Sequence, residues 1–531
     1  MSDQHSTTGG PDGRSAIGPT GDRDTAAPDD IREANIAAGK AVATAVRTTL
    51  GPNGMDKLLV RDGSYVTTND GAKILELMEI DHPAASALVD VASSQATAVG
   101  DGTTTAVVLT GALLEHAEDL LERGIHPNTI VAGYHEAATL ATEAIESQTI
   151  DAAIDKETLG QLAVTAMNGK GIGTVTARRL ADLVVDAIYR VREGDHVDRE
   201  SLALVSHHGA STAATQLVNG LVVTEQPLNA RLSVSEFKVP RILVLDTELG
   251  VRTGSGEVGY RLERADELAA ARTAEDEELL ATASMIANDT TADVVFCTER
   301  VDDRIAHLLV EERVLVYDEV DDETAGQIAR ATNASRLGHL RDFDIDDEGQ
   351  VKGIKIEPDV DGNKLTYLQG KEAKNTVTLL IRGGTRHVSD ELKRVVSDAV
   401  DVVTSAVESG GIVPGAGAVE LATAEFLRGR ATAVDGREQL AVEAFADAVE
   451  SIPEQLTASA GLDPLDSITE LRHEHERQER VGVVTDGPTT TLTDPVPHGV
   501  LDSTDVKRSA IETATEVSTL LLRIDDVVPA K

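Results

Sequence analysis

The strongest constraint on the fold is a change in apolar spacing that occurs twice along the 531-residue chain. Residues 31–122, and the chain after residue 388, carry apolar residues at helical spacing. Between them, residues 241–246, 293–296 and 314–317 are short apolar runs typical of buried strands, with helical patterns separating them, as in an α/β layer. Helix-rich ends around an α/β middle predict one discontinuous helical domain with the middle inserted into it.

Smaller signals refine this division. Residues 58–60 and 65–68 flank a turn-forming Asp-Gly pair and predict a hairpin within the first helical part. Residues 217–223 read as one strand, and residues 340–367 as an acidic, β-rich excursion. Residues 1–28 are rich in Gly, Ser, Thr, Asp and Pro, which predicts a disordered tail.

The charge balance limits the partners and the location of the chain. It has 91 Asp and Glu against 48 Lys and Arg, a net charge of −43, which repels nucleic acids and anionic membranes. The acidic residues are spread along the whole length, which favours a halophilic protein in a salt-rich cytosol. No apolar run is long enough to span a bilayer, and the N-terminus lacks a signal-peptide core. We therefore expect a cytoplasmic protein.

The composition of the core is also predictable. Aromatic residues make up 2% of the chain and Trp is absent, so Ala, Val, Leu and Ile must fill the interior. The single cysteine, Cys297, allows no internal disulfide, fits a reducing compartment, and lies in an apolar run as a small core residue. The histidines show no metal-ligand spacing.

The most informative local motif is Gly100-Asp101-Gly102-Thr103-Thr104-Thr105, which precedes an apolar helix. Glycine allows the backbone to approach a ligand closely, and a helix N-terminus presents free N–H groups to phosphate. The threonine hydroxyls add donors, and Asp101 could hold Mg²⁺ together with phosphate oxygens. A capped helix start is the alternative, since no Gly-Lys-Ser/Thr of a P-loop follows.

Two further Gly-rich turns and two carboxylates are weaker candidates. Leu50-Gly51-Pro52-Asn53-Gly54 ends a helix, and Gly415-Ala416-Gly417 precedes one; each alone is also a routine turn. Asp70 reads equally well as a helix N-cap, and Asp398 as a solvated carboxylate on a helix. Paired carboxylates near a nucleotide could hold Mg²⁺ and orient water, but spacing alone does not show that these two meet.

Taken together, these segments resemble the group II chaperonins, or thermosomes, from about residue 31 to residue 528. The motifs that carry the resemblance are Val46-Arg47-Thr48-Thr49-Leu50-Gly51-Pro52-Asn53-Gly54-Met55-Asp56-Lys57, Thr68-Asn69-Asp70-Gly71, His82-Pro83-Ala84-Ala85, Val99-Gly100-Asp101-Gly102-Thr103-Thr104-Thr105, Gly436-Arg437-Glu438-Gln439-Leu440, Ala460-Gly461-Leu462-Asp463-Pro464 and Leu522-Arg523-Ile524-Asp525-Asp526-Val527.

The resemblance implies a multidomain chaperonin fold. An all-α, discontinuous equatorial domain with a small β-hairpin would bind ATP, a small α/β intermediate domain would act as the hinge, and an α/β apical domain with a helical protrusion would bind substrate. The implied bounds are 29–145 and 404–531 for the equatorial domain, 146–216 and 369–403 for the intermediate domain, and 217–368 for the apical domain. Such subunits form a double ring, with themselves or with paralogues, that encloses unfolded proteins on ATP hydrolysis.

The resemblance also assigns site residues, with ATP and Mg²⁺ as cofactors and K⁺ as a further candidate. Asp70 and Asp398 would activate the attacking water, and Asp101 would bind the metal. The residues implied to contact the nucleotide are Leu50, Gly51, Pro52, Gly102, Thr103, Thr104, Thr105, Lys170, Gly415, Gly417 and Asp502.

Several departures from the family pattern keep other functions open. Ala416 stands within the family's triple glycine, Ser503 replaces a frequent proline, and residues 486–498 match poorly. The expected protrusion, near residues 247–287, carries Ala, Thr and acidic residues where relatives often have large apolar ones. A non-catalytic or specialised subunit of mixed rings is therefore the alternative. A kinase-type enzyme using the same loop is a more distant one.

Overall fold

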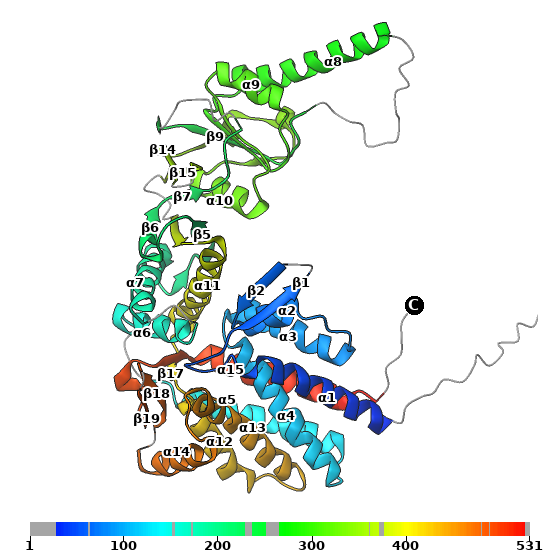
Figure 1. The fold of residues 1–531 in the computed structure, drawn as a ribbon, viewed down its shortest axis with the longest axis vertical. Coiled ribbons are helices and arrows are strands. Elements are labelled where there is room, and N and C mark those ends of the chain that lie inside the picture. Colours follow the sequence, from blue (N-terminus) through cyan, green and yellow to red (C-terminus); the bar gives the residue numbers. More distant parts are fainter. Residues whose placement is uncertain are drawn as a thin grey trace, which may run out of the picture.

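The computed structural model describes residues 28–61, 64–150, 154–170, 174–228, 236–250, 265–359, 362–370, 376–478, 480–487 and 489–525. The tail expected over residues 1–28 lies outside this set, apart from Pro28, where the first helix begins. Figure 1 shows three bodies stacked along one axis, which we call the lower, middle and upper bodies. Both ends of the chain contribute to the lower body, so its discontinuous nature agrees with the sequence.

The lower body is a helical bundle. Its helices are α1 (Pro28–Arg47), α2 (Gly71–Leu77), α3 (Pro83–Val99), α4 (Thr103–Glu122), α5 (Pro127–Ser147), α12 (Ala418–Ala431), α13 (Glu438–Ser459), α14 (Pro464–Gln478) and α15 (Thr504–Arg523). Ala, Val, Leu and Ile dominate its core, as the composition predicts. Tyr134 and Phe445 are exceptions, whose rings meet edge-on with centroids 5.5 Å apart.

The described part of the lower body also contains three antiparallel strand pairs, whereas the sequence predicts one hairpin. The predicted hairpin is present as β1 (Lys57–Arg61) and β2 (Ser64–Thr68). The additional pairs are β17 (Ile412–Pro414) with β20 (Leu501–Ser503), and β18 (Gly482–Asp486) with β19 (Thr489–Thr493). β17 and β20 are far apart in sequence, so their pairing joins distant segments of the chain in the part of the lower body that lies beside the middle body.

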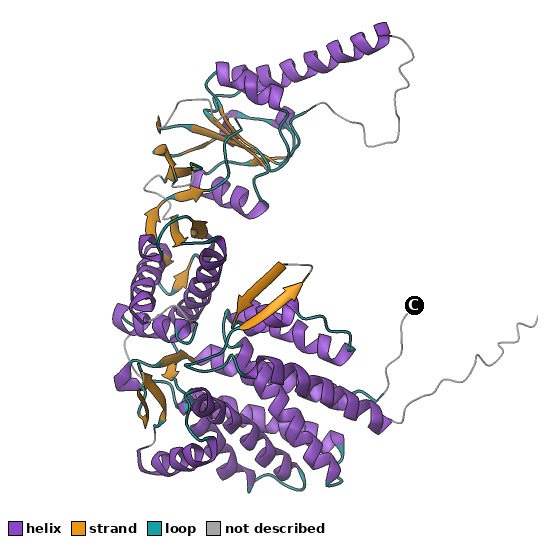
Figure 2. Ribbon diagram, in the orientation of Figure 1, coloured by secondary structure: helices purple, strands orange, loops and turns teal. Residues whose placement is uncertain are grey.

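The middle body packs three helices on a small sheet (Figure 2). The helices are α6 (Lys156–Met167), α7 (Thr174–Val191) and α11 (Arg386–Ser409). In the sheet, β16 (Val377–Gly383) runs parallel to β5 (Leu202–His208) and antiparallel to β6 (Gln216–Asn219); a two-residue pair, β3 (Arg192–Glu193) with β4 (His196–Val197), follows α7. Thr385 caps the start of α11, and Gly410 ends it in the left-handed conformation.

The upper body is a sheet buried on both faces. Strands β9 (Arg241–Leu245), β10 (Val294–Cys297), β11 (Leu315–Tyr317) and β12 (Arg336–Leu337) are parallel, and β13 (Gly349–Gln350) is antiparallel to β9. Helices α8 (Ala265–Ser284) and α9 (Asp303–Glu311) cover one face. The other face packs on α10 (Asp322–Thr332) and on a second sheet ordered β7 (Leu221–Val223), β15 (Lys364–Gln369), β14 (Gly353–Pro358) and β8 (Glu236–Lys238).

Individual residues confirm this two-faced burial. Alternate residues of β9 belong to different apolar clusters, so Ile242 faces the second sheet and Leu243 faces α8 and α9. Cys297 is fully buried on the α8 side, and burial raises the pKa of its thiol to about 11. The interpretation of Cys297 as a core residue is therefore confirmed.

One strand prediction is wrong. Residues 217–223 form two strands, because the chain breaks at Gly220 and passes from the middle sheet to the upper one. Gly220 has a φ of 108°, and a Cβ on it would lie 2.0 Å from the carbonyl oxygen of Leu368. Both facts require glycine at this position. The Asn219-Gly220 pair, a turn signal between two short apolar runs, marks the crossing between two bodies.

The segment expected to protrude is only partly described. Residues 251–264 lie outside the described set, and α8 extends away from the upper body in Figure 1. Near its C-terminal end Leu279 and Ala283 are buried, while Leu280 is 52% exposed. None of the helices in the described part of the chain is both long and apolar enough to cross a membrane.

Candidate active site

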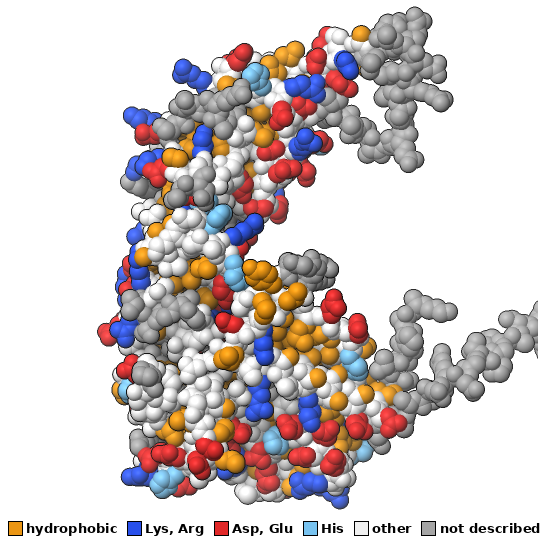
Figure 3. Space-filling view, in the orientation of Figure 1, with side chains coloured by type: hydrophobic (Ala, Val, Ile, Leu, Met, Phe, Trp, Pro, Cys, Tyr) orange, Lys and Arg blue, Asp and Glu red, His pale blue; other side chains and the backbone are white. Residues whose placement is uncertain are grey.

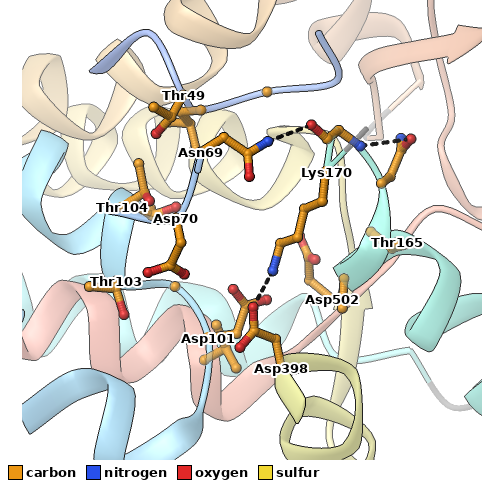
Figure 4. Close-up of a pocket in the computed structure, with 18 of the residues that line it drawn as sticks. Thr49, Asn69, Asp70, Asp101, Thr103, Thr104, Thr165, Lys170, Asp398 and Asp502 are labelled. Carbon is orange, nitrogen blue, oxygen red and sulfur yellow. Dashed lines mark hydrogen bonds and ion pairs between the residues drawn. The ribbon is translucent and has the colours of Figure 1, made fainter. Parts of the chain in front are cut away.

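A cavity of about 520 Å³ lies where the lower and middle bodies meet, a size typical of small-molecule sites. Figure 4 shows residues from both bodies pointing into it. The predicted site residues that line it are Leu50, Gly51, Pro52, Asp70, Asp101, Gly102, Thr103, Thr104, Thr105, Lys170, Asp398, Gly417 and Asp502. Residues separated by hundreds of positions in sequence are thus brought together around one cavity.

The 100–105 motif forms one wall. Gly102, at the N-cap of α4, has a φ of 79° and leaves the first turn without a side-chain cap. The N–H groups of that turn are therefore free to bind an anion. Gly100 allows close contact with α11, because a Cβ there would lie 2.1 Å from Cβ of Asp401. The motif therefore begins a helix, borders the cavity and packs against a helix of another body.

The turn after α1 forms a second wall. Gly51 has a φ of 109°, and its carbonyl oxygen lies so near Gly169 that a Cβ on Gly169 would be 2.6 Å away. Asn69 Nδ2 donates to the carbonyl oxygen of Gly169 at 2.8 Å (Figure 4). These contacts hold the loop that carries Lys170 against the lower body.

The two candidate carboxylates meet through one arginine. Asp70 caps α2, with Oδ1 accepting from the backbone N–H of Lys73 at 2.5 Å, and its Oδ2 lies 2.5 Å from Nη1 of Arg394. Asp398 Oδ2 accepts from Lys170 and lies 3.3 Å from the same Arg394 nitrogen. The Asp398 side chain is 15% exposed, so its interpretation as an ordinary solvated carboxylate is wrong. Asp70 is both a helix cap and a cavity residue.

The charges in this part of the cavity are strongly coupled. Burial raises the pKa of Asp398 to about 6, although the positive charges of Lys170 and Arg394 act in the opposite direction. For Lys170, burial would lower the pKa, but the carboxylates of Asp398 and Asp101 outweigh it and raise the pKa overall. Lys170 therefore stays protonated, while Asp398 can gain or lose a proton near neutral pH.

The cavity lining also includes a second buried charge cluster and several apolar side chains. Lys507 Nζ lies 2.8 Å from Asp502 Oδ2 and 2.7 Å from Glu420 Oε1. Burial opposes the charge on Lys507, but the two carboxylates prevail and raise its pKa. The apolar residues of the cavity lining include Ile452, Leu456, Val483, Val500 and Val506. Leu456 and Val506 lie beside Gly51 and Gly102, so apolar side chains also border the two glycine-rich turns.

The 415–417 turn borders the cavity and packs against β18. Ala416 and Gly417 line the cavity; Gly415 is not among the described lining residues, and its N–H donates to the carbonyl oxygen of Val500 at 3.0 Å. Ala416 adopts a φ of 58°, and its Cβ lies 3.0 Å from where a Cβ on Gly482 would be. The methyl group is thus accommodated against a glycine of β18.

The poorly matching residues 486–498 affect the cavity little. None of the described residues of that segment lines it, whereas Val483 and Thr485 precede the segment and Val500 follows it. Ser503, the other departure, lies at the N-cap of α15 with its hydroxyl 3.1 Å from that of Ser405.

Sequence reasoning missed several cavity residues, namely Asn69, Arg394, Asp401 and Lys507. Arg394 carried the one usable signal, because it lies one helical turn before Asp398 and must share its face of α11. Lys507 lies in the first turn of α15, where its partners could not be predicted, since Glu420 is 87 residues away.

The arrangement also fits a metal that depends on its ligand. Asp101 lines the cavity, but among the described residues no group of three or more His, Cys, Asp or Glu side chains could hold an ion unaided. Mg²⁺ commonly uses one or two carboxylates and completes its shell with phosphate oxygens and water. Asp101 at the start of a phosphate-compatible loop is consistent with that mode.

Comparison with known proteins adds an independent observation. Residues 42–531 match the TCP-1/cpn60 chaperonin family. The chain is 48% identical to thermosome subunit 3 of Haloferax volcanii, over 94% of this chain and 95% of that protein. It is 41% identical to a thermosome subunit of Methanopyrus kandleri and 39% identical to thermosome subunit alpha of Halobacterium salinarum, covering 94% of this chain and 92% and 89% of theirs.

Proposed function

The chain belongs to the TCP-1/cpn60 chaperonin family, as a group II chaperonin of a halophilic archaeon, and from that premise we propose that it is an ATP-driven protein-folding subunit. The observation that carries the proposal is the convergence of three glycine-rich turns and two carboxylates, from both bodies, on one cavity. ATP is the ligand that such a cavity would take, because its lining combines phosphate-compatible turns with apolar side chains.

We propose that the three bodies are the domains that the resemblance implies. The lower body would be the equatorial domain, residues 29–145 and 404–531; the middle one the intermediate domain, residues 146–216 and 369–403; and the upper one the apical domain, residues 217–368. The expected boundary at residue 403 falls inside α11, whose apolar residues through Val407 pack with the middle body. The proposed hinge therefore lies nearer Gly410.

Each group in the cavity has a proposed role in hydrolysis. The first-turn amides and hydroxyls of Thr103, Thr104 and Thr105 would bind phosphate oxygens, as would the Gly51 turn. Bound Mg²⁺, held by Asp101, would neutralise charge on the phosphates. Asp70 and Asp398 would orient the attacking water, and Asp398 would accept its proton.

The remaining residues would position the nucleotide. Lys170 stays protonated and points into the cavity, so it would contact the terminal phosphate (Figure 4). Asp502 would accept a hydrogen bond from a ribose hydroxyl, with Lys507 fixing its orientation. Gly417, and the backbone near Gly415, would border the sugar or the phosphates.

The surface of the lower body supports assembly into a ring. On the β1–β2 hairpin and the turn before it, Met55, Leu58, Val60 and Tyr65 are each more than 60% exposed. Figure 3 shows hydrophobic side chains gathered in this region, on the concave side of the molecule. A contiguous exposed apolar patch indicates a protein interface. We propose that its occupant is another copy of this chain or a paralogous subunit, and that unfolded proteins bind the upper body.

The decisive experiment is an ATPase assay in high KCl with the Asp398→Ala variant. We expect the variant to bind ATP while its turnover falls by about two orders of magnitude or more, because a general base is lost. Asp390→Ala, at a site on the same helix that is 54% exposed, is the matched control. Undiminished turnover in Asp398→Ala would reject the assignment.

Electron microscopy of the same preparation tests the assembly. Double rings formed by the purified chain, together with ATPase activity, would reject the alternative of a non-catalytic subunit that works only in mixed rings. That alternative is not favoured, because both carboxylates line the cavity and Ala416 is accommodated beside Gly482. The kinase-type alternative has no observation in its favour.

A further inference from the structure

The cavity contains an arginine to which the sequence analysis gave no role. Arg394 projects from α11 one turn before Asp398, and its side chain is 20% exposed. Its Nη1 atom lies 2.5 Å from Oδ2 of Asp70 and 3.3 Å from Oδ2 of Asp398. One nitrogen thus joins the two carboxylates proposed to activate water. We call these two contacts the Arg394 bridge.

A third carboxylate fixes the direction of the bridge. Glu391, three residues earlier on α11, accepts from Arg394 Nη2 at 2.5 Å and from Nε at 3.2 Å. Such a two-point grip sets the plane of a guanidinium group. With Nε and Nη2 held by Glu391, Nη1 is directed at Asp70 and Asp398.

The bridge constrains the proposed chemistry. A carboxylate beside a cation is a weaker proton acceptor than a free one, and Asp398 also accepts from Lys170. Arginine binds phosphate through strong charged hydrogen bonds, so a phosphate group in the cavity would compete with the carboxylates for it. Release of Arg394 would free oxygen atoms of Asp70 and Asp398 to bind water.

We propose that Arg394 distinguishes nucleoside triphosphate from diphosphate, by leaving its bridge between Asp70 and Asp398 to bind the terminal phosphate. This inference rests on the proposed function. A diphosphate lacks the group that competes for Arg394, so the bridge persists and keeps α11 tied to the loop before α2. When the γ-phosphate binds Arg394, the direct link between α11 and the loop before α2 would be replaced by a link through the nucleotide.

The test is calorimetric binding of ADP and of adenylyl imidodiphosphate, a slowly hydrolysed ATP analogue, to the full-length protein with Mg²⁺ in high KCl. In Arg394→Met we expect affinity for the analogue to fall about 10- to 100-fold, the value of a hydrogen bond to a charged group. Affinity for ADP should change less than about twofold, because ADP has no γ-phosphate. Arg394→Lys should recover part of the loss.

Two further variants separate this role from a structural one. Arg386→Met makes the same change on α11 at a side chain that is 85% exposed, and should bind both nucleotides normally. Glu391→Gln loosens the grip on Arg394 and should weaken analogue binding more than ADP binding. Equal losses for both nucleotides in Arg394→Met, or no loss for the analogue, would overturn the inference. Failure of the unaltered protein to bind either nucleotide would instead overturn the proposed function.

Discussion

Two charged junctions join the middle body to its neighbours, and they differ in their access to solvent. At the lower junction Arg394 contacts Asp70 and Asp398, and the three side chains are 15–20% exposed beside the cavity. At the upper junction Arg382 Nη2 contacts Asp359 Oδ1 at 3.0 Å, with side chains 8% and 3% exposed. His207 Nε2 lies 2.5 Å from the other Asp359 oxygen, and the cavity lining includes none of these three residues.

The two junctions use the same residue types for different purposes, because they differ in their access to solvent and to ligands. A ligand can enter the lower junction and exchange partners with its charges, so its contacts can change during a reaction. The upper junction is enclosed, and each of its charges depends on the others for compensation. We therefore expect substitutions at the lower junction to change turnover, and those at the upper junction to change stability.

The largest effect is expected at the upper junction. Asp359→Asn leaves the Arg382 guanidinium buried without its countercharge, which typically costs about 3–5 kcal/mol. For a body of this size, such a loss lowers the midpoint of thermal unfolding by about 10 °C, measurable by scanning calorimetry. Asp195→Asn removes the same charge at a side chain 91% exposed and should leave the midpoint unchanged. Equal midpoints of thermal unfolding for the two variants would contradict the structural role assigned to the upper junction.

Asp70→Asn is the counterpart at the lower junction. We expect ATP turnover to fall about 100-fold, because one of the two carboxylates proposed to orient water loses its charge. Asparagine caps helices as well as aspartate does, so α2 should keep its N-cap and the thermal midpoint should shift little. A loss of thermal stability as large as that of Asp359→Asn would show that this junction, too, is mainly structural.

Lys507→Met should give a smaller and different effect. Without the ammonium group, Asp502 and Glu420 lose their shared partner, and Asp502 is no longer fixed for the proposed contact with the ribose. We expect the KM for ATP to rise about tenfold with kcat nearly unchanged, because the lost contact would be equally strong in the ground state and the transition state. The neighbouring Arg508→Met, 39% exposed, is the control. A fall in kcat with constant KM would contradict the proposed role.

The smallest effect is the dependence of turnover on pH. The pKa of Asp398 is raised by burial to about 6, and only the ionised form can accept a proton from water. Turnover should therefore be constant above that value and fall as pH drops through it, by about tenfold per unit. The residual activity of Asp398→Asn should not show this fall at low pH. If the fall persists in that variant, another group is responsible for it.

The sequence predicted the local elements well, because Gly and Pro mark their ends clearly. Gly51 and Pro52 follow α1, and Asp70 caps α2, as its interpretation as a helix N-cap predicts. The prediction failed at Gly220, where the Asn219-Gly220 turn signal was read through as one strand, and nothing local shows that the chain leaves one sheet for another there. The β18–β19 hairpin was also missed, because residues 486–498 are rich in Thr and Pro.

For the site, the sequence pointed to many of the residues that line the cavity but missed others, and it did not show how they are paired. Asp70 and Arg394 are 324 positions apart, and no spacing rule relates them. Their contact depends on the packing of α11 across the two bodies, a tertiary property. The resemblance to a family supplied roles for Asp398 and Lys170, yet Arg394 entered only through the geometry of the structure.

The length of α11 has a mechanical consequence. The helix is one unbroken rod of 24 residues from Arg386 to Ser409, which corresponds to about 36 Å at the usual rise per residue. Asp398 and Arg394 lie near its midpoint, while its N-terminal end follows directly from β16, beside the upper junction. A tilt of about 10° around the Gly410 end would carry the far end through about 6 Å for a rod of that length. A displacement of about 3 Å at Asp398, halfway along the rod, would thereby be about doubled at the base of the upper body.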